Sequence, residues 1–283
     1  MIPKRHYKSG VEVSIIGFGG IVVVGMEQKA ANEFVTMSIE KGVNYFDVAP
    51  TYGNGEAEAK LGIALESFRE KVFLACKTTE RHASEAQKEL HQSLKRLHTD
   101  HFDLYQFHGV SSMEDVEKIC APNGAAEVFM KAKQEGKVRF LGFSAHSEQA
   151  ALAMLDHFDF DSVLYPINFV CYAQGNFGQQ LIRRAKEKDV TLLAIKSMAY
   201  TPFPEGAIKK YPNCWYLPID DPALAKQALR FTLDAGASTI IPPGDPRLFS
   251  LALDLAADLK PLSSHEREEL LASSRGIQPI FKA

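Results

Sequence analysis

Four residues of the sequence, an acid, a phenol, an amine and an imidazole, carry groups that proton transfer uses. Asp47 and Tyr52 lie in the segment FDVAPTYGNGEAEAKLG, Lys77 lies in FLACKT, and His108 lies in LYQFHG. A free tyrosine has a pKa of about 10, so it protonates a developing alkoxide efficiently at neutral pH only in a tuned environment. A nearby Lys77 would favour the phenolate, and Asp47 would hold that lysine charged and in place. Together the side chains would form a tuned proton donor.

Each of these residues, taken alone, also has an ordinary structural interpretation. Asp47 could cap a turn, and Tyr52 could pack at the rim of a pocket. Lys77 could extend its ammonium to solvent, and His108 could be a hydrogen-bonded core histidine. The chemistry is therefore a hypothesis that depends on the four side chains coming together.

A proton donor of this kind needs a reaction partner that supplies electrons. No Ser or Cys lies beside a histidine–carboxylate pair, and no group of His, Asp and Glu has the spacing of metal ligands. We therefore expect no metal. A bound hydride donor would complete the chemistry.

The elements that must position these residues follow from a regular alternation along the chain. Apolar runs rich in β-branched and aromatic residues recur, each followed by a segment with helical spacing. Helices are expected, for example, over 85–98 and over 222–236, the second of which runs from a proline to a glycine. The expected strands cover residues 13–20, 44–49, 72–77, 102–108, 138–144, 161–168, 190–195 and 238–242.

Strand runs with little polar alternation indicate a parallel sheet covered by helices, and eight βα units in roughly 250 residues suit a closed barrel. We predict an α/β protein with a (β/α)8 TIM barrel rather than a doubly wound sheet. Residues 1–283 are expected to form a single domain, because no linker or break in composition divides them. One further helix, capped by Ser264, is expected after Ala257.

In such barrels the active site lies at the carboxyl ends of the strands. Asp47 lies near the end of the second expected strand, with Tyr52 in the following loop, and Lys77 and His108 end the third and fourth strands. The barrel would therefore bring all four together.

The composition limits the partners. Charged residues make up 24 % of the 283-residue chain and the net charge is −3, so no basic field exists to attract nucleic acid or an anionic membrane. A small-molecule partner is expected. The four cysteines are scattered singly, and neither a signal peptide nor an apolar stretch of about 18 residues is present, which indicates a reduced, cytoplasmic protein.

The segments FDVAPTYGNGEAEAKLG, FLACKT, DLYQFHG and GFSAHS, in this order and spacing, resemble the aldo-keto reductase superfamily, and the resemblance spans almost the whole chain. The preceding YKSGVEVSIIGFGG is similar to the family's N-terminal β-hairpin and first strand. The family's four catalytic residues fall on Asp47, Tyr52, Lys77 and His108. The resemblance implies an NAD(P)H-dependent oxidoreductase that reduces small aldehydes and ketones to alcohols, with Tyr52 as general acid and His108 orienting the carbonyl.

The resemblance also implies a set of cofactor contacts, several of which depart from the family pattern. Ser144 matches, but the asparagine that often follows it is replaced by alanine, and Asn168 is the nearest amide in the sixth strand. Ile195 and Lys196 stand where many members have a stacking tyrosine and a serine. The residues assigned to the cofactor are Gly19, Gly20, Ser144, Asn168, Ile195, Lys196, Pro243, Gly244 and Arg247.

The eighth unit decides which nicotinamide nucleotide is expected. Pro243 stands where many members have a lysine for the 2′-phosphate of NADP, whereas Gly244 and the amides of the next helix could still bind phosphate. Arg247 could supply the missing charge. We expect NADP from the resemblance and keep NAD open.

A second interpretation is a nucleotide-binding regulatory subunit that senses redox state with little turnover, as channel-associated members of the family do. The complete set of four catalytic residues favours the enzyme, and the altered carboxamide contacts favour the subunit. The oligomeric state, monomer or homo-oligomer, stays open, as does the physiological substrate.

Overall fold

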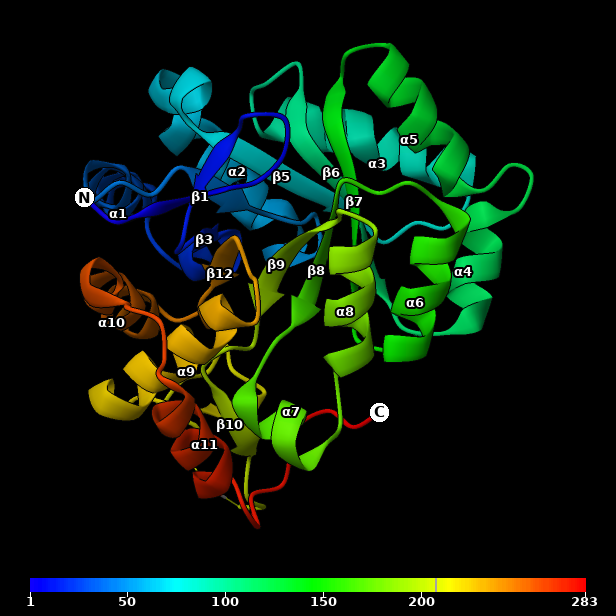
Figure 1. Cartoon of the computed structure of the whole chain (residues 1–283). Helices are drawn as coiled ribbons and strands as arrows, with labels where there is room; N and C mark the ends of the chain where they lie inside the picture. Colours follow the sequence, from blue (N-terminus) through cyan, green and yellow to red (C-terminus); the bar gives the residue numbers. More distant parts are fainter. Residues whose placement is uncertain (207) are drawn as a thin grey trace.

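The computed structural model describes residues 1–206 and 208–283, and its centre is a parallel sheet of eight strands. Each barrel strand pairs with the one that precedes it in this sheet, so the order in space follows the order in the chain (Figure 1). The strands are β3 (Phe18–Gly19), β4 (Tyr45–Asp47), β5 (Phe73–Thr78), β6 (Phe102–Val110), β7 (Val138–Ala145), β8 (Ser162–Pro166), β9 (Thr191–Ile195) and β12 (Thr239–Ile241).

The first and last strands meet and close the sheet into a barrel. Ile16 forms an isolated parallel bridge with Ile240. The Gly17 amide donates to the Ile240 carbonyl at 2.8 Å, and the Ile240 amide donates to the Ile15 carbonyl at 2.9 Å. The predicted (β/α)8 barrel is thus confirmed.

Helices surround the barrel on the outside (Figure 1). They are α1 (Gln28–Glu40), α2 (Glu56–Leu65), α3 (Ala83–Arg96), α4 (Met113–Cys120), α5 (Ala125–Gln134), α6 (Glu148–His157), α7 (Phe169–Gln174), α8 (Gln179–Glu187), α9 (Pro222–Asp234), α10 (Pro246–Leu255) and α11 (Ser264–Ser273). Short 3-10 helices are η1 (Gly20–Val23), η2 (Tyr52–Gly55), η3 (Glu66–Lys71) and η4 (Ala256–Asp258). Among the helices of the described residues, none is both long and apolar enough to cross a lipid bilayer.

The expected helix boundaries hold to within two residues. Helix α9 begins at Pro222 behind the Asp221 cap and is followed by Gly236 at φ 104°. Helix α3 ends at Arg96, two residues before the expected limit, because His98 adopts a left-handed conformation with φ 50°. The cap of α11 is Ser263 and not the expected Ser264, because Ser263 and Glu266 form a reciprocal capping box.

An N-terminal hairpin covers the amino end of the barrel. It consists of β1 (Lys4–His6) and β2 (Glu12–Ser14), which pair antiparallel. Tyr7 from its turn packs with Tyr45, Phe73 and Phe140 in the barrel interior and donates to Ser162 Oγ at 2.9 Å. The single strand expected over 13–20 is therefore wrong in extent: its start belongs to this hairpin, its end to the barrel, and Gly20 already begins η1.

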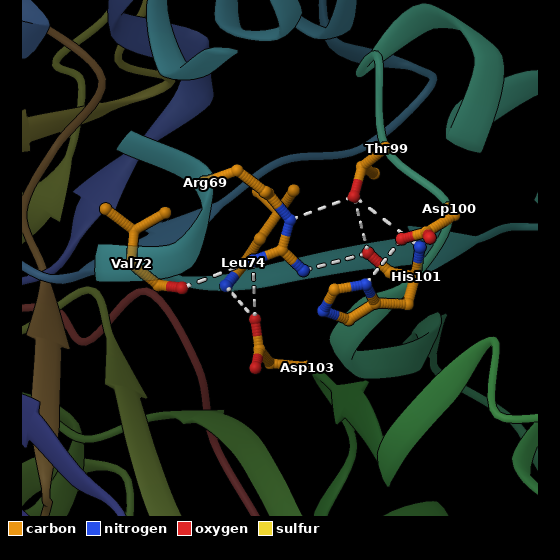
Figure 2. A network of polar contacts seen from close by, with 7 residues as sticks. All are labelled: Arg69, Val72, Leu74, Thr99, Asp100, His101 and Asp103. Carbon is orange, nitrogen blue, oxygen red and sulfur yellow. Dashed lines mark hydrogen bonds and ion pairs between the residues drawn. The ribbon is translucent and has the colours of Figure 1, made fainter. Parts of the chain in front are cut away.

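A network centred on Arg69 joins the amino ends of β5 and β6, away from the carboxyl ends of the strands (Figure 2). Arg69 contacts Asp103 Oδ2 at 3.1 Å, Thr99 Oγ1 at 2.9 Å and the His101 carbonyl at 2.9 Å. The same Asp103 oxygen accepts from the Leu74 amide at 2.9 Å. This contact set ties η3 to the start of both strands, and we interpret it as structural.

A second hairpin, which the sequence patterns did not predict, follows β9 on the opposite side of the barrel (Figure 1). It pairs β10 (Ala199–Pro202) with β11 (Tyr216–Pro218), antiparallel and with a register shift. The loop between β9 and α9 thus becomes an ordered wall beside the carboxyl ends of the strands.

Candidate functional site

The carboxyl ends of the strands surround a pocket of about 230 Å³. The four candidate catalytic residues Asp47, Tyr52, Lys77 and His108 all line it, although they come from β4, its loop, β5 and β6. The cofactor candidates that also line it are Gly19, Ser144, Ile195, Lys196, Pro243 and Gly244.

Tyr52 reaches the pocket because of the tight turn that follows it. Asp47 ends β4, the Tyr52 amide donates to the Ala49 carbonyl at 3.0 Å, and Tyr52 opens η2. The next three residues all have positive φ: 60° at Gly53, 53° at Asn54 and 90° at Gly55. Residues that adopt this backbone at low cost are glycine and asparagine, which explains the sequence Tyr-Gly-Asn-Gly.

Lys77 and Asp47 form a buried ion pair beneath the phenol. Their side chains are only 1 % and 2 % exposed. The Lys77 ammonium also donates to the Val48 carbonyl at 3.2 Å, and Gln106 Nε2 donates to the second Asp47 oxygen at 3.1 Å. Burial alone would lower the pKa of Lys77, but the charge of Asp47, its hydrogen bond and the proximity of Tyr52 together outweigh burial and raise the pKa above the ordinary value. Lys77 is therefore a fixed cation.

The phenol of Tyr52 lies against this cation, with Lys77 Nζ 5.2 Å from the centre of the ring. Burial raises the pKa of Tyr52, and Lys77 pulls that pKa down without fully offsetting the burial. The expected influence of Lys77 is thus present, but burial is larger. Tyr52 keeps its proton at neutral pH and is placed as a proton donor.

His108 stands beside the phenol as a neutral ring. The centres of the Tyr52 and His108 rings are 5.9 Å apart, with an interplanar angle of 86°. Burial, helped by the charge of Lys77, lowers the pKa of His108 to about 3. Nδ1 is buried and has no hydrogen-bond partner among the described residues. A neutral imidazole offers one N–H, which suits it to hold an oxygen that Tyr52 protonates.

The remaining walls suit a flat, amide-bearing ring. Leu164, Ile195 and Ile241 provide apolar surface. Ser144 Oγ accepts from the Gly109 amide at 2.8 Å, which leaves its hydroxyl hydrogen for another acceptor. At Gly244 a Cβ atom would lie 2.4 Å from Ile21 Cγ2, so only glycine lets these two loops meet at the rim. This set of groups fits the nicotinamide half of a dinucleotide.

Three cofactor candidates lie outside the pocket lining. Gly20 packs behind it, since a Cβ there would meet Val48 at 2.9 Å. Asn168 caps α7, accepting from the Cys171 amide at 2.9 Å, while its amide nitrogen donates to the Lys196 carbonyl at 3.0 Å. The Arg247 guanidinium is held by Asp245 through bonds of 2.9 and 2.8 Å.

Several lining residues escaped the sequence assignment. They are Ile21, His146, Leu164, Asn213, Trp215, Tyr216, Ile241 and Pro242. Trp215 and Tyr216 come from the second hairpin, and the one available signal was a dense aromatic segment, CWY, in the long stretch between β9 and α9. Burial lowers the pKa of His146 to about 4. Its ring stacks on Phe281, with centres 5.4 Å apart.

Comparisons with known proteins point to one family. The model of the Aldo/keto reductase family matches residues 16–213. The aldo-keto reductase YhdN of Bacillus subtilis is 34 % identical over 156 residues, which cover 49 % of this chain and 45 % of that protein. The chain therefore spans less than half the length of this relative. The 6-dehydroglucose reductase of Novosphingobium aromaticivorans is 28 % identical over 224 residues, 71 % of this chain and 68 % of that protein.

A solved structure gives the same fold. The aldo-keto reductase AKR11C1 from Bacillus halodurans, in its holo form, superimposes with a TM-score of 0.78, covers 99 % of each chain and is 24 % identical. At this level of identity the likeness concerns the fold alone.

Proposed function

The chain belongs to the aldo/keto reductase family, as the match over residues 16–213 shows, and from this premise we propose that it reduces aldehydes or ketones with a nicotinamide nucleotide, using Tyr52 as general acid. The observation that carries the proposal is the buried Lys77–Asp47 pair beneath a protonated phenol, next to a neutral histidine, in one pocket. A buried pair of this kind tunes the proton donor that lies next to it.

The protein groups divide the proton chemistry among them. The reduced nicotinamide, when bound, supplies a hydride to the carbonyl carbon. His108 holds the carbonyl oxygen through its single N–H, and Tyr52 passes its hydroxyl proton to that oxygen as charge develops there. The resulting phenolate is stabilised by Lys77, which Asp47 and Gln106 keep in place, until solvent returns the proton. Alcohol oxidation is the same sequence reversed, with Tyr52 as base.

The nucleotide would be held by Ser144 at the carboxamide, by Ile195 against the ring and by Gly19, Pro243 and Gly244 at the rim. For NADP, the Arg247 guanidinium would have to leave Asp245 to reach a 2′-phosphate. We therefore propose that both NADPH and NADH bind, with NADPH preferred to the extent that Arg247 is released.

We also place this activity in the cytoplasm. All four cysteines of the sequence are free thiols, and three of them are buried. Free cysteines persist in reducing compartments, whereas disulfides form in the oxidising environments of secreted proteins.

A second candidate function is a regulatory subunit that binds the nucleotide and turns over little. The observation that favours it is the position of Asn168. Its side-chain amide caps α7 and binds the Lys196 carbonyl, and Asn168 does not line the pocket, so a usual contact to the carboxamide is missing. Against it stands the intact proton donor, which a sensor does not need.

The test is a titration of the purified chain with NADPH and NADH, followed by carbonyl compounds. Trp215 is the only tryptophan of the sequence and lines the pocket, so its fluorescence reports binding directly. Binding with oxidation of the reduced nucleotide by aldehydes supports the enzyme. Binding without turnover of aldehydes, ketones or quinones would favour the regulatory subunit, and no binding of either nucleotide would contradict both.

A further inference from the structure

Lys196 has an unfavourable backbone conformation that two hydrogen bonds to its carbonyl hold in place. It directly follows β9 and has φ 64°, a left-handed value that costs a non-glycine residue roughly 1 kcal/mol or more. The Ala199 amide donates to the Lys196 carbonyl at 2.9 Å, and Asn168 Nδ2 donates to the same oxygen at 3.0 Å. Strain that is fixed from two sides is typical of a functional position.

The side chain lies in the pocket between two aromatic rings. Lys196 Nζ is 5.2 Å from the centre of the Tyr216 ring and 5.6 Å from that of Trp215. Such rings hold a cation in place without neutralising it. Burial lowers the pKa of Lys196 to about 8, so the amine is still mostly charged at neutral pH.

The charge of Lys196 has no carboxylate partner among the residues that the structure describes. Lys77, the other lysine of the pocket, is paired with Asp47, which is the acidic residue of the described lining. The charge of Lys196 also lowers the pKa of His108 and of His146, so it acts within the site where the carbonyl oxygen would be held. The pocket therefore carries an uncompensated positive charge.

We propose that Lys196, held by Trp215 and Tyr216, is an anion subsite, and that the preferred substrates are aldehydes or ketones that carry a carboxylate on the same small molecule. The carboxylate would pair with Lys196 while the carbonyl oxygen faces Tyr52 and His108. This inference rests on the proposed function. The rival source of the anion is the pyrophosphate of the nucleotide, and the test separates the two.

The test uses a matched pair of substrates, 4-carboxybenzaldehyde and its uncharged methyl ester, with wild type and Lys196→Met. A partly buried charge pair predicts that Lys196→Met lowers kcat/KM for the carboxylate about 10- to 100-fold more than it lowers kcat/KM for the ester. Lys196→Arg should retain the preference. Lys209→Met removes a charge from the same loop outside the pocket lining and should change neither value.

Calorimetry measures the affinity of wild type and Lys196→Met for the two compounds, and fluorescence titration measures their affinity for the nucleotide. Weaker binding of the carboxylate alone supports the subsite, even if neither compound is turned over, in which case only the proposed function fails. An equal loss for both compounds, or a loss confined to the affinity for the nucleotide, would overturn the subsite. Equal affinity of the wild type for acid and ester would overturn it as well.

Discussion

The Lys77 ammonium and the Asp47 carboxylate are paired on the floor of the pocket, thirty positions apart in sequence and almost inaccessible to solvent. Buried ion pairs contribute little net stability, because desolvation offsets their attraction, whereas breaking one leaves an uncompensated charge. A pair in this place is best explained by what it does to Tyr52. Stability and activity should therefore respond differently to its removal.

Lys77→Met should lower the free energy of unfolding by about 3 kcal/mol, because Asp47 is left buried without its partner. The double variant Asp47→Asn/Lys77→Met should recover much of that loss, since no buried charge remains, yet neither variant should reduce carbonyl compounds. Urea unfolding and steady-state kinetics on the same preparations check both parts. If the double variant were as unstable as the sum of the single variants Asp47→Asn and Lys77→Met, the two residues would be energetically independent, which would contradict this prediction.

His108 should make the fold sensitive to acid. Its pKa is about 3 in the folded chain against 6.5 for the free side chain, so the unfolded state binds a proton that the folded state does not. Stability must then rise with pH over this window and fall on acidification. Between pH 7 and pH 5 this residue should cost about 2 kcal/mol. The comparison is urea unfolding of wild type and His108→Asn at both pH values; a loss of equal size in both proteins would refute the assignment.

Asp245 should limit the preference for NADPH, because it holds the Arg247 guanidinium. Asp245→Asn weakens that hold and keeps a good cap on α10, since asparagine caps helices as well as aspartate does. The affinity for NADPH should rise about three- to tenfold relative to NADH, as expected for a released arginine on a phosphate. Fluorescence titration with both nucleotides measures this ratio. Adding Arg247→Ala should cancel the gain, and a gain that survived would exclude Arg247 as its source.

The Arg69 network should be purely structural, because it lies at the amino ends of β5 and β6 (Figure 2). Arg69→Met leaves Asp103 without its partner and should lower the free energy of unfolding by about 2–4 kcal/mol. Kinetic constants should stay within about twofold of wild type. The exposed neighbour Lys71→Met is the control and should change stability by less than about 0.5 kcal/mol. If Arg69→Met changed the kinetic constants more than Lys71→Met does, the network would be coupled to the pocket and the prediction would be wrong.

Much of this protein could be predicted from its sequence because the barrel turns local patterns into global positions. When strands and helices alternate in a barrel, the carboxyl ends of all strands lie on the same face. This alone was enough to predict that Asp47, Lys77 and His108 come together. The confirmed family and fold rest on this logic. The loop that carries Tyr52 could also be predicted, because the Gly-Asn-Gly sequence directly after it favours a turn.

The rest depended on which of several possible partners each polar side chain contacts in the fold. The sequence suggested that Arg247 is available to a phosphate, but in the structure Asp245 accepts hydrogen bonds from two of its three guanidinium nitrogens. The sequence suggested that Asn168 binds the nicotinamide carboxamide, but in the structure its side chain caps α7. Trp215 lies in the pocket because of the second hairpin. No alternation of apolar and polar residues in the sequence predicted this hairpin or its register. Side chains with several possible partners cannot be assigned from spacing alone.

The most direct measurement is single-turnover reduction of 4-carboxybenzaldehyde and its methyl ester by wild type and Tyr52→Phe, after fluorescence titration has fixed the affinity of each for the nucleotide. Tyr52→Phe removes one hydroxyl and keeps the ring against Lys77. We predict unchanged nucleotide affinity and a loss of reduction of about 10²- to 10⁴-fold for both compounds. Wild-type rates in Tyr52→Phe would contradict it, because the proton would then come from another group.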